Sequence, residues 1–264
     1  MKVSAIIPAR YQSTRLPGKP LALIAGEPMI RWVYERARRA RYVHEVWVAT
    51  DDEKIYQAVK GFGGNCRMTA SYHPSGTDRI AELARTMDWD IVINVQGDEP
   101  LIDPQMIDQV VESLQDDESV SVSTLKRKIT VAADIINPNV VKVITDQHDY
   151  ALYFSRAPIP YCRSLWQSFE EIDAGPVPEG MFKHVGLYGY RRNFLMHITS
   201  LPPTTLETAE RLEQLRILEH GFRISVKTTD KDSIGVDSPD DLERVRELVG
   251  MNGLSCIIKE TNVG

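Results

Sequence analysis

The sequence has few cysteines and no long apolar run. Its 264 residues contain three cysteines, Cys66, Cys162 and Cys256, which are odd in number, widely spaced and never arranged as Cys-x-x-Cys. This pattern is typical of a reducing compartment and argues against a disulfide framework, so we expect a cytoplasmic protein. No apolar run approaches the roughly 20 residues that cross a bilayer. The N-terminus enters a predicted strand directly, without the pattern of a signal peptide.

The sequence also lacks an excess of positive charge and the common nucleotide-binding fingerprints. The formal net charge is −6, which argues against non-specific binding to nucleic acid. Neither the Walker A loop nor the Gly-x-Gly-x-x-Gly loop of dinucleotide-binding folds occurs. The six histidines show no metal-ligand spacing. These absences exclude the best-known phosphate loops, nucleic-acid binding through a basic surface and a histidine-based metal site.

A basic loop follows the first predicted strand. The apolar run Val3–Ile7 leads into a segment that carries Arg10, Arg15 and Lys19 and is punctuated by prolines and one glycine. Cations and free backbone N–H groups beyond a buried strand are suited to a polyphosphate. From charge and position alone, an ordinary basic surface loop remains an equal alternative.

Strand-like and helix-like segments alternate along much of the chain. Short buried runs such as 46–49 and 91–95 are separated by amphipathic segments such as Met29–Arg41. This alternation predicts an α/β fold with a mostly parallel sheet covered by helices on both faces. Ligands of such sheets bind beyond the carboxyl ends of the strands, which places the basic loop and Asn94–Pro100 at the same edge.

The domain prediction is one unit over residues 1–250 with an excursion at 120–190, followed by an unassigned tail at 251–264. The excursion contains strand-like segments and a turn at Asp146–Asp149, which indicate antiparallel strands. Further along, the apolar spacing predicts a single helix over Glu207–His220 and another over Pro239–Gly250. Ser75 or Thr77 is a predicted N-cap for the helix that follows them.

Asn94–Pro100 carries an acidic pair at the end of a buried strand. Asp98 and Glu99 follow Gly97, which permits a tight turn, and carboxylates at this position suit Mg²⁺ shared with phosphate oxygens. The alternative is an ordinary Asp turn before the helix that begins near Pro104.

A set of motifs in a fixed order then resembles one family. The basic loop is similar to the signature loop of sugar-activating nucleotidyltransferases, in the form used by cytidylyltransferases for acidic sugars. The same order continues over roughly residues 1–249 through SGTDR (75–79), NVQGDEP (94–100), YFSRAPIP (153–160), HVGLYGY (184–190), LEQLRILEHG (212–221) and GVDSPDDLERV (235–245). One such motif is weak, whereas the ordered set is specific.

The resemblance implies a nucleotide site and a metal site. Its nucleotide-binding residues are Arg10, Arg15 and Lys19 on the triphosphate, and Ser75, Gly76, Thr77 and Arg79 around the cytosine and ribose. Mg²⁺ is the implied cofactor, held by Asp98 and Asp237, a pair that the sequence alone does not connect. Arg10, Lys19, Asp98 and Asp237 are therefore the expected catalytic residues.

The resemblance also implies a sugar site and a homodimer. The expected sugar-binding residues are Gln96, Arg156, His184, Tyr188, Glu213 and Gln214, and the excursion is the expected dimer contact. The Arg156 guanidinium suits the carboxylate of the sugar. His184 and Tyr188 are four apart in one predicted strand, so they share a face and we expect them to bond sugar hydroxyls.

The implied reaction joins CTP to the acidic eight-carbon sugar 3-deoxy-manno-octulosonate (Kdo) and releases pyrophosphate, as in lipopolysaccharide biosynthesis. Alternatives are an 8-amino analogue of this sugar, a CMP-sialate-type synthetase, a glycosyltransferase that uses a nucleotide-sugar, and a catalytically silent nucleotide-binding protein. The silent protein is disfavoured because Lys19, Asp98 and Asp237 are all present. No partner nucleic acid or membrane is expected.

Overall fold

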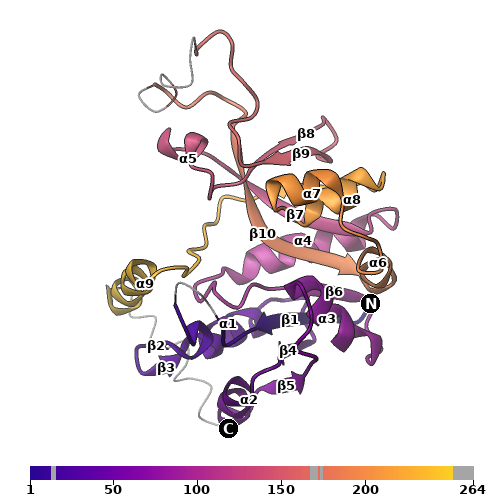
Figure 1. The fold of residues 1–264 in the computed structure, drawn as a ribbon, viewed down its shortest axis with the longest axis vertical. Helices are drawn as coiled ribbons and strands as arrows, with labels where there is room; N and C mark the ends of the chain where they lie inside the picture. Colours follow the sequence, from indigo (N-terminus) through magenta and orange to yellow (C-terminus); the bar gives the residue numbers. More distant parts are fainter. Residues whose placement is uncertain (13–15, 167–171, 173–174, 252–264) are drawn as a thin grey trace.

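The computed structural model describes residues 1–12, 16–166, 172 and 175–251, and these residues build one large mixed sheet with helices on both faces (Figure 1). The main path of the sheet follows the order β11 (Ser225–Thr228), β7 (Val122–Lys128), β10 (Phe182–Arg191), β6 (Ile91–Asn94), β1 (Val3–Ala9), β4 (Glu45–Thr50) and β5 (Asn65–Met68). β8 (Lys142–Thr145) pairs with β10 and with β9 (Ala151–Ser155) beside this path.

Strand β10 is the reversed strand of the main path. It is antiparallel to both of its neighbours, β6 and β7, whereas the pairs β6–β1, β1–β4, β4–β5 and β7–β11 are all parallel. The other strands of the path therefore share one direction, and their carboxyl ends meet at one edge. The predicted mostly parallel sheet is confirmed.

Helices cover both faces of the sheet and bury two separate apolar layers. Helices α1 (Met29–Arg38), α2 (Glu53–Gly61) and α4 (Pro104–Asp116) pack with Ile7 of β1, whereas α3 (Gly76–Arg85), α6 (Arg192–Ile198) and α8 (Gln214–Glu219) pack with Ile6. Alternate side chains of β1 thus enter opposite layers, as the pleat requires. Burial on both faces explains why β1 is apolar at almost every position.

Two helix starts are capped by side chains, and the cap at Ser75 is one of the two that the sequence predicts there. The Asp52 carboxylate accepts hydrogen bonds from the backbone N–H groups of Lys54 (2.9 Å) and Ile55 (3.2 Å) at the start of α2. The Ser75 hydroxyl accepts from the Asp78 N–H at 3.1 Å at the start of α3. Each bond satisfies a donor that the helix itself leaves without a partner.

Helix α9 (Pro239–Met251) packs against the N-terminal part of the chain. Its Val245 and Val249 share an apolar cluster with Ile24, Met29 and Trp32, which belong to the short hairpin of β2 (Leu23–Ile24) and β3 (Glu27–Pro28) and to α1. Figure 1 shows α9 beside this hairpin, which the 3₁₀ turn η1 (Lys19–Leu21) directly precedes in the chain. The late segment around residue 237 is thereby brought to the basic loop.

The predicted single helix over residues 207–220 is wrong. The chain forms α7 (Thr205–Glu210) and α8 instead, because Arg211 between them adopts a left-handed backbone with φ 53° and ψ 48°. Helix α7 has no buried residue, so α7 and α8 do not share a continuous apolar face that would favour one long helix. The apolar residues that suggested one helix begin only at Leu212, which is buried between α7 and α8.

The excursion at 120–190 does contain antiparallel strands. The hairpin of β8 and β9 turns at Asp146, whose carboxylate accepts the N–H groups of His148 and Tyr150 at 2.9 Å each. Beyond it, α5 (Ala133–Ile136) contributes to a small separate cluster with Ile129, Trp166 and Met181. Figure 1 shows this part projecting from the main sheet.

None of the helices in the described part of the chain combines the length and the apolar character that a membrane crossing requires. The predicted tail lies outside the described residues from 252 onward, and so does Arg15 of the basic loop.

Gly189 of β10 tests the packing of the reversed strand against α4. A Cβ added at Gly189 would lie 2.5 Å from Val110 Cγ1 and 2.9 Å from Leu114 Cδ1. Overpacking of a close-packed core of this kind costs roughly 1–3 kcal/mol. We expect Gly189→Ala to lower the free energy of unfolding by about that amount in urea denaturation. Gly186→Ala in the same strand is the control, because nothing lies within 4 Å of its added Cβ; equal losses in both variants would contradict this account.

Candidate active site

The basic loop lies at the carboxyl end of β1. The Nη2 of Arg10 donates to the His73 carbonyl at 2.6 Å, which ties this loop to the segment before α3. Gly18 adopts a left-handed conformation with φ 69°, and its N–H donates to the Tyr11 carbonyl at 3.0 Å. The next residue, Lys19, begins η1 and points back toward the sheet edge. Arg10, Lys19, Ser75 and Gly76 line a cavity of about 480 Å³, called here the loop cavity.

Lys19 joins two carboxylates that are far apart in the sequence. Its Nζ lies 2.7 Å from Asp98 Oδ2 and 3.1 Å from Asp237 Oδ1. The two carboxylate oxygens are therefore less than about 6 Å apart, since both contact one ammonium group. Burial opposes the charge on Lys19, but attraction and hydrogen bonds from both aspartates outweigh it and raise the pKa of Lys19.

Backbone contacts hold this pair of carboxylates in place. The Val236 N–H donates to the Asp98 carbonyl at 2.8 Å, so the segment before α9 lies directly against the end of β6. The Asp241 carboxylate accepts the N–H groups of Asp237 (3.1 Å) and Ser238 (2.9 Å) and fixes the turn into α9. Gly97 is required here, because an added Cβ would lie 2.9 Å from the Pro8 carbonyl oxygen.

The Asp98–Asp237 pair fits part of a magnesium site. Both oxygens already contact one cation, the Lys19 ammonium, and carboxylate oxygen is a preferred ligand of Mg²⁺. Within the described residues no group of three or more His, Cys, Asp or Glu side chains is placed to hold a metal ion. Two carboxylates leave the remaining positions to phosphate oxygens and water, as is usual for Mg²⁺. Desolvation, with the neighbouring Asp98 carboxylate as the second cause, raises the pKa of Glu99 to about 7.

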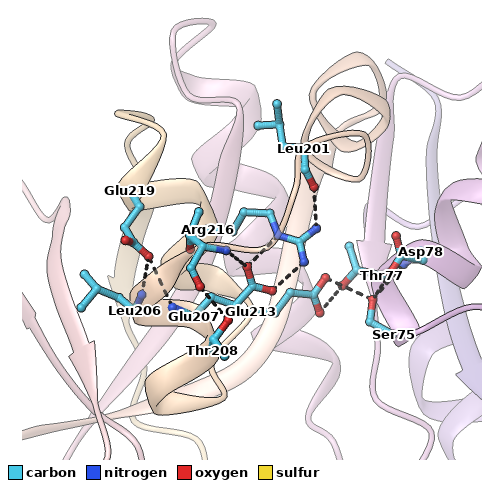
Figure 2. Close-up of polar contacts among 11 residues, drawn as sticks. Ser75, Thr77, Asp78, Leu201, Leu206, Glu207, Thr208, Glu213, Arg216 and Glu219 are labelled. Carbon is cyan, nitrogen blue, oxygen red and sulfur yellow. Dashed lines mark hydrogen bonds and ion pairs between the residues drawn. The ribbon is translucent and has the colours of Figure 1, made fainter.

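The start of α3 is linked to the start of α8 by one carboxylate. Figure 2 shows Glu213 reaching the Ser75 hydroxyl at 3.2 Å and the Thr77 hydroxyl at 3.1 Å. Burial raises the pKa of Glu213, and the hydrogen bond from Thr77 opposes this shift. A predicted sugar-binding residue, Glu213, is therefore hydrogen-bonded directly to two predicted nucleotide-binding residues, Ser75 and Thr77.

Arg79 is placed differently from the other predicted nucleotide-binding residues. Its side chain is fully buried, with Nη1 donating to Thr69 Oγ1 at 2.5 Å and Nη2 paired with Asp51 at 3.1 Å. The guanidinium therefore joins the start of α3 to Thr69 and Asp51, and it does not line the loop cavity.

A second cavity of about 510 Å³, the inner cavity, lies beside the loop cavity. Its lining includes the predicted sugar residues Gln96, Arg156, His184, Tyr188, Glu213 and Gln214, together with Asp98 and Asp237. Gln96 and Asp98 line both cavities. The structure thus brings all the predicted site residues that it describes, apart from the buried Arg79, to two adjoining spaces that meet at Asp98.

His184 and Tyr188 lie on one face of β10, as predicted. Their ring centroids are 5.3 Å apart, and the His184 ring also meets Phe154 at 5.0 Å. The His184 Nε2 lies 3.0 Å from the Thr124 hydroxyl. Burial lowers the pKa of His184 to about 3 and raises the pKa of Tyr188 well above its ordinary value. Both side chains are therefore neutral at physiological pH, which suits hydrogen bonding to hydroxyls and not proton transfer.

Arg156 is already engaged with the protein. Its Nε donates to the Glu210 carbonyl and its Nη1 to the Pro138 carbonyl, both at 2.8 Å. The Glu210 carboxylate in turn accepts the Arg156 N–H at 2.9 Å and the Ser155 hydroxyl at 2.5 Å. Arg156 lines the inner cavity while it fastens the end of α7 to the end of β9.

The inner cavity also contains residues that the sequence reasoning did not single out. These are Asn94, Gly186, Tyr190, Ile198, Thr199, Arg211, Leu212, Arg216 and Ile217. Tyr190 follows Tyr188 by two positions in β10, so strand alternation places it on the same face. Arg216 forms a fork with Glu207 at 2.8 and 2.6 Å (Figure 2). No sequence pattern of this kind identifies Arg211, because its position depends on the break between α7 and α8, which the sequence does not predict.

The fold and the two cavities define a class. A largely parallel sheet with a basic loop after its first strand, and with paired aspartates at the same edge, is the arrangement of a nucleotidyltransferase-like protein. The cytidylyltransferase family model matches residues 4–227. The chain belongs to the cytidylyltransferase family and is a nucleotidyltransferase.

Named relatives cover nearly the whole chain. It is 55% identical over 247 residues to 3-deoxy-manno-octulosonate cytidylyltransferases of Pelobacter propionicus and Geobacter sulfurreducens, covering 94% of this chain and 97% and 99% of theirs. A solved structure of CMP:2-keto-3-deoxy-manno-octonic acid synthetase complexed with CTP superposes with a TM-score of 0.87 at 44% identity, over 96% of this chain and 100% of the other. A cytidylyltransferase from Leptospira borgpetersenii, 17% identical with a TM-score of 0.59 over 98% of this chain and 97% of the other, shares the fold.

The pKa of His184 gives a testable dependence of stability on pH. An unfolded histidine has a pKa near 6.5, whereas the folded value is about 3. Between these values the unfolded chain binds a proton that the folded chain does not, so stability falls as pH falls below about 6.5. His184 lowers the free energy of unfolding by roughly 1 kcal/mol for each pH unit in this range.

We expect His184→Gln to flatten the decline in the free energy of unfolding between pH 6 and pH 4, measured by urea denaturation. His148→Gln, on the exposed hairpin turn, is the matched control and should leave the slope of wild type unchanged. A slope in His184→Gln as steep as that of wild type would contradict a lowered pKa of His184 in the folded protein.

Proposed function

We propose that this enzyme transfers the cytidylyl group of CTP to 3-deoxy-manno-octulosonate, an acidic eight-carbon sugar, and releases pyrophosphate. The product is the activated sugar used in lipopolysaccharide biosynthesis, and the reaction is proposed to take place in the cytoplasm. The observation that carries the proposal is the meeting of the loop cavity and the inner cavity at Asp98 beside Lys19. The relatives at 55% identity support the choice of nucleotide and sugar.

The loop cavity is proposed to hold CTP. Arg10 and Lys19 are cations at its edge and suit the triphosphate, as does Arg15, which lies outside the described residues. Ser75, Gly76 and Thr77 at the start of α3 supply hydroxyl and backbone groups for the ribose and the base. Arg79 is proposed to keep this segment in position through Asp51 and Thr69.

The inner cavity is proposed to hold the sugar. Neutral His184 and Tyr188 face it from β10, and Glu213 and Gln214 face it from the start of α8. These groups suit a substrate with many hydroxyls, because each buried polar group must find a partner. Gln96 donates to the Gly186 carbonyl at 3.2 Å and lies where the two cavities meet.

The reaction is proposed to be an in-line displacement. The anomeric hydroxyl oxygen of the sugar forms a bond to the α-phosphorus, the bond from that phosphorus to the β-phosphate oxygen breaks, and pyrophosphate leaves. The hydroxyl proton passes to solvent, since no described residue is placed as an obvious base. The chain contributes chiefly positioning and charge stabilisation, which account for most catalysis of phosphoryl transfer.

A divalent ion, Mg²⁺, completes the proposed site. Asp98 and Asp237 would hold it, and when bound it would polarise the α-phosphate. Lys19 keeps the two carboxylates together in the free protein and is placed to contact a phosphate once they hold a metal.

A homodimer is proposed to form through the excursion. Several apolar side chains there are exposed, among them Val131, Leu152, Tyr161 and Leu165. Exposed apolar groups gathered on one projecting part are typical of a contact between protein surfaces. Sedimentation equilibrium of the intact chain tests the proposal, which a monomer at all concentrations would overturn.

Pyrophosphate release across a panel of nucleotides and acidic sugars tests the proposed function. Phosphate contacts cannot distinguish bases, so selection depends on the groups around Ser75 and Thr77. We expect strong preference for CTP over ATP and GTP, with UTP a weaker competitor, and turnover with 3-deoxy-manno-octulosonate. Equal turnover with ATP would contradict the proposal. Preference for the 8-amino analogue or for sialate would redirect the choice of sugar.

The paired aspartates are proposed to act mainly in the transition state. Asp98→Asn and Asp237→Asn keep the shape of each side chain and remove its charge. We expect each variant to fold and to bind CTP, but to lose roughly 100- to 1,000-fold in kcat. The double variant should lose far less than the product of the two, because both residues serve one ion.

Asp240→Asn in the first turn of α9 is the matched control, since Asp240 lines neither cavity. Removal of divalent ions with EDTA should abolish wild-type turnover, and added Mg²⁺ should restore it. Losses in the two single variants that multiply in the double variant would argue against a shared ion.

A further inference from the structure

Lys142 of β8 is a fully buried lysine that lines neither the loop cavity nor the inner cavity. Its Nζ donates to the backbone carbonyls of Asn137 at 2.9 Å and Val140 at 2.6 Å, and it forms no ion pair with any described residue. Burial lowers the pKa of Lys142 to about 8, and the nearby Glu210 carboxylate opposes this shift. An ammonium loses its hydration when it is buried, and two neutral partners offset only part of that cost. Stability alone therefore does not account for a lysine at this position.

The two carbonyls that Lys142 binds begin and end one tight turn, Asn137–Val140, called here the proline turn. The Val140 N–H donates to the Asn137 carbonyl at 3.1 Å, and Pro138 occupies the second position, where proline is favoured. The Asn137 Oδ1 accepts the Asn139 N–H at 2.9 Å and stiffens the same turn. Lys142 therefore fixes both ends of the proline turn from the interior of the protein.

A central carbonyl of the proline turn holds Arg156. The Nη1 of Arg156 donates to the Pro138 carbonyl at 2.8 Å, whereas its Nε donates to the Glu210 carbonyl at 2.8 Å and its Nη2 to the Arg211 carbonyl at 3.5 Å. Arg156 lines the inner cavity, and Glu210 and Arg211 form the break between α7 and α8. One guanidinium thus connects the proline turn to the break from which α8 starts.

The start of α8 is the far end of this connection. Glu213 and Gln214, directly after the break, line the inner cavity. Ser155, which lies opposite Lys142 in the pairing of β8 with β9, donates to the Glu210 carboxylate at 2.5 Å and holds the end of α7. A shift of the proline turn would therefore displace the start of α8 relative to β10, which lines the same cavity.

The loop cavity is less closely connected to Lys142. Among the described residues, Lys142, the proline turn and Arg156 form no hydrogen bond with the residues that line the loop cavity. The bond of Glu213 to Ser75 joins the two cavities at the start of α3. A disturbed proline turn should therefore affect the ligand of the inner cavity much more than the ligand of the loop cavity.

We propose that Lys142 is a positioning residue for the sugar, which it serves by holding the proline turn and, through that turn, Arg156 and the start of α8. Lys142 itself does not touch the substrate. This inference rests on the proposed function, because it concerns the sugar of that same reaction. It adds a residue outside both cavities to the groups that determine how well the sugar binds.

Steady-state kinetics of two variants test the proposal. Lys142→Met keeps the apolar stem of the side chain and removes the ammonium. We expect it to raise KM for 3-deoxy-manno-octulosonate by about 10-fold, because small displacements of binding groups have effects of this order. The value of kcat should stay nearly unchanged, and KM for CTP should rise much less. Asn137→Ala removes the side-chain acceptor of the same turn at a partly exposed position and should raise KM for the sugar by a smaller factor.

A double variant tests whether Lys142 acts through Arg156. Arg156→Met alone should raise KM for the sugar. When Lys142→Met is added to it, we expect little further increase, because effects of residues in one hydrogen-bond network are not independent. Increases that multiply in the double variant would contradict the connection through Arg156 and overturn the inference.

Lys126→Met is the matched control. Lys126 of β7 is also buried and lines neither cavity, and its Nζ contacts Thr145 Oγ1 at 2.6 Å and Asp149 Oδ1 at 2.7 Å in the β8–β9 hairpin. This variant should lose stability in urea denaturation and keep the wild-type KM for both substrates. A rise in KM for the sugar as large as that of Lys142→Met would indicate general loosening and overturn the inference.

The remaining outcomes separate this inference from the proposed function. Equal increases in KM for CTP and for the sugar in Lys142→Met overturn the inference alone, as does an unchanged KM for the sugar. If Lys142→Met does not fold, the same two outcomes in Asn137→Ala decide. Absence of turnover with CTP and this sugar in wild type overturns the proposed function, and this inference with it.

Discussion

The contact of one ammonium group with two carboxylates organises this molecule. Lys19 comes from the loop after β1, Asp98 follows β6, and Asp237 precedes α9, so a single cation joins three separate parts of the chain. Without it, two carboxylates would face each other at short range in a partly enclosed space, where like charges repel strongly. The position of both cavities follows from this contact, because Asp98 belongs to each of them.

The sheet gives that contact a rigid base. Strands of one direction deliver their carboxyl ends to a common edge, and the reversed β10 carries His184 and Tyr188 into the same region from the opposite direction. One antiparallel strand in an otherwise parallel path therefore adds side chains to the lining of the inner cavity. The loop cavity is lined mainly by loops after parallel strands, whereas the inner cavity draws much of its lining from β10 and the turn between α7 and α8.

Local signals were sufficient for much of this arrangement. The caps at Asp52 and Ser75, the turn at Asp146 and the position of Asp98 follow from short-range chemistry that neighbouring residues determine. The break at Arg211 was not predictable in this way, because the sequence around it continues to favour a helix and the turn is held by contacts with distant residues. The closeness of Asp237 to Lys19 likewise depends on the docking of α9 and not on any local pattern.

The docking of α9 on the N-terminal hairpin has a consequence for biosynthesis. The strands of the sheet and the basic loop all precede residue 229, so they leave the ribosome before Asp237 and α9 do. Until then Ile24, Met29 and Trp32 lack the apolar partners that cover them in the finished fold. The growing chain thus lacks its second aspartate until residue 237 has been made, and α9 then both covers this apolar cluster and completes the candidate active site.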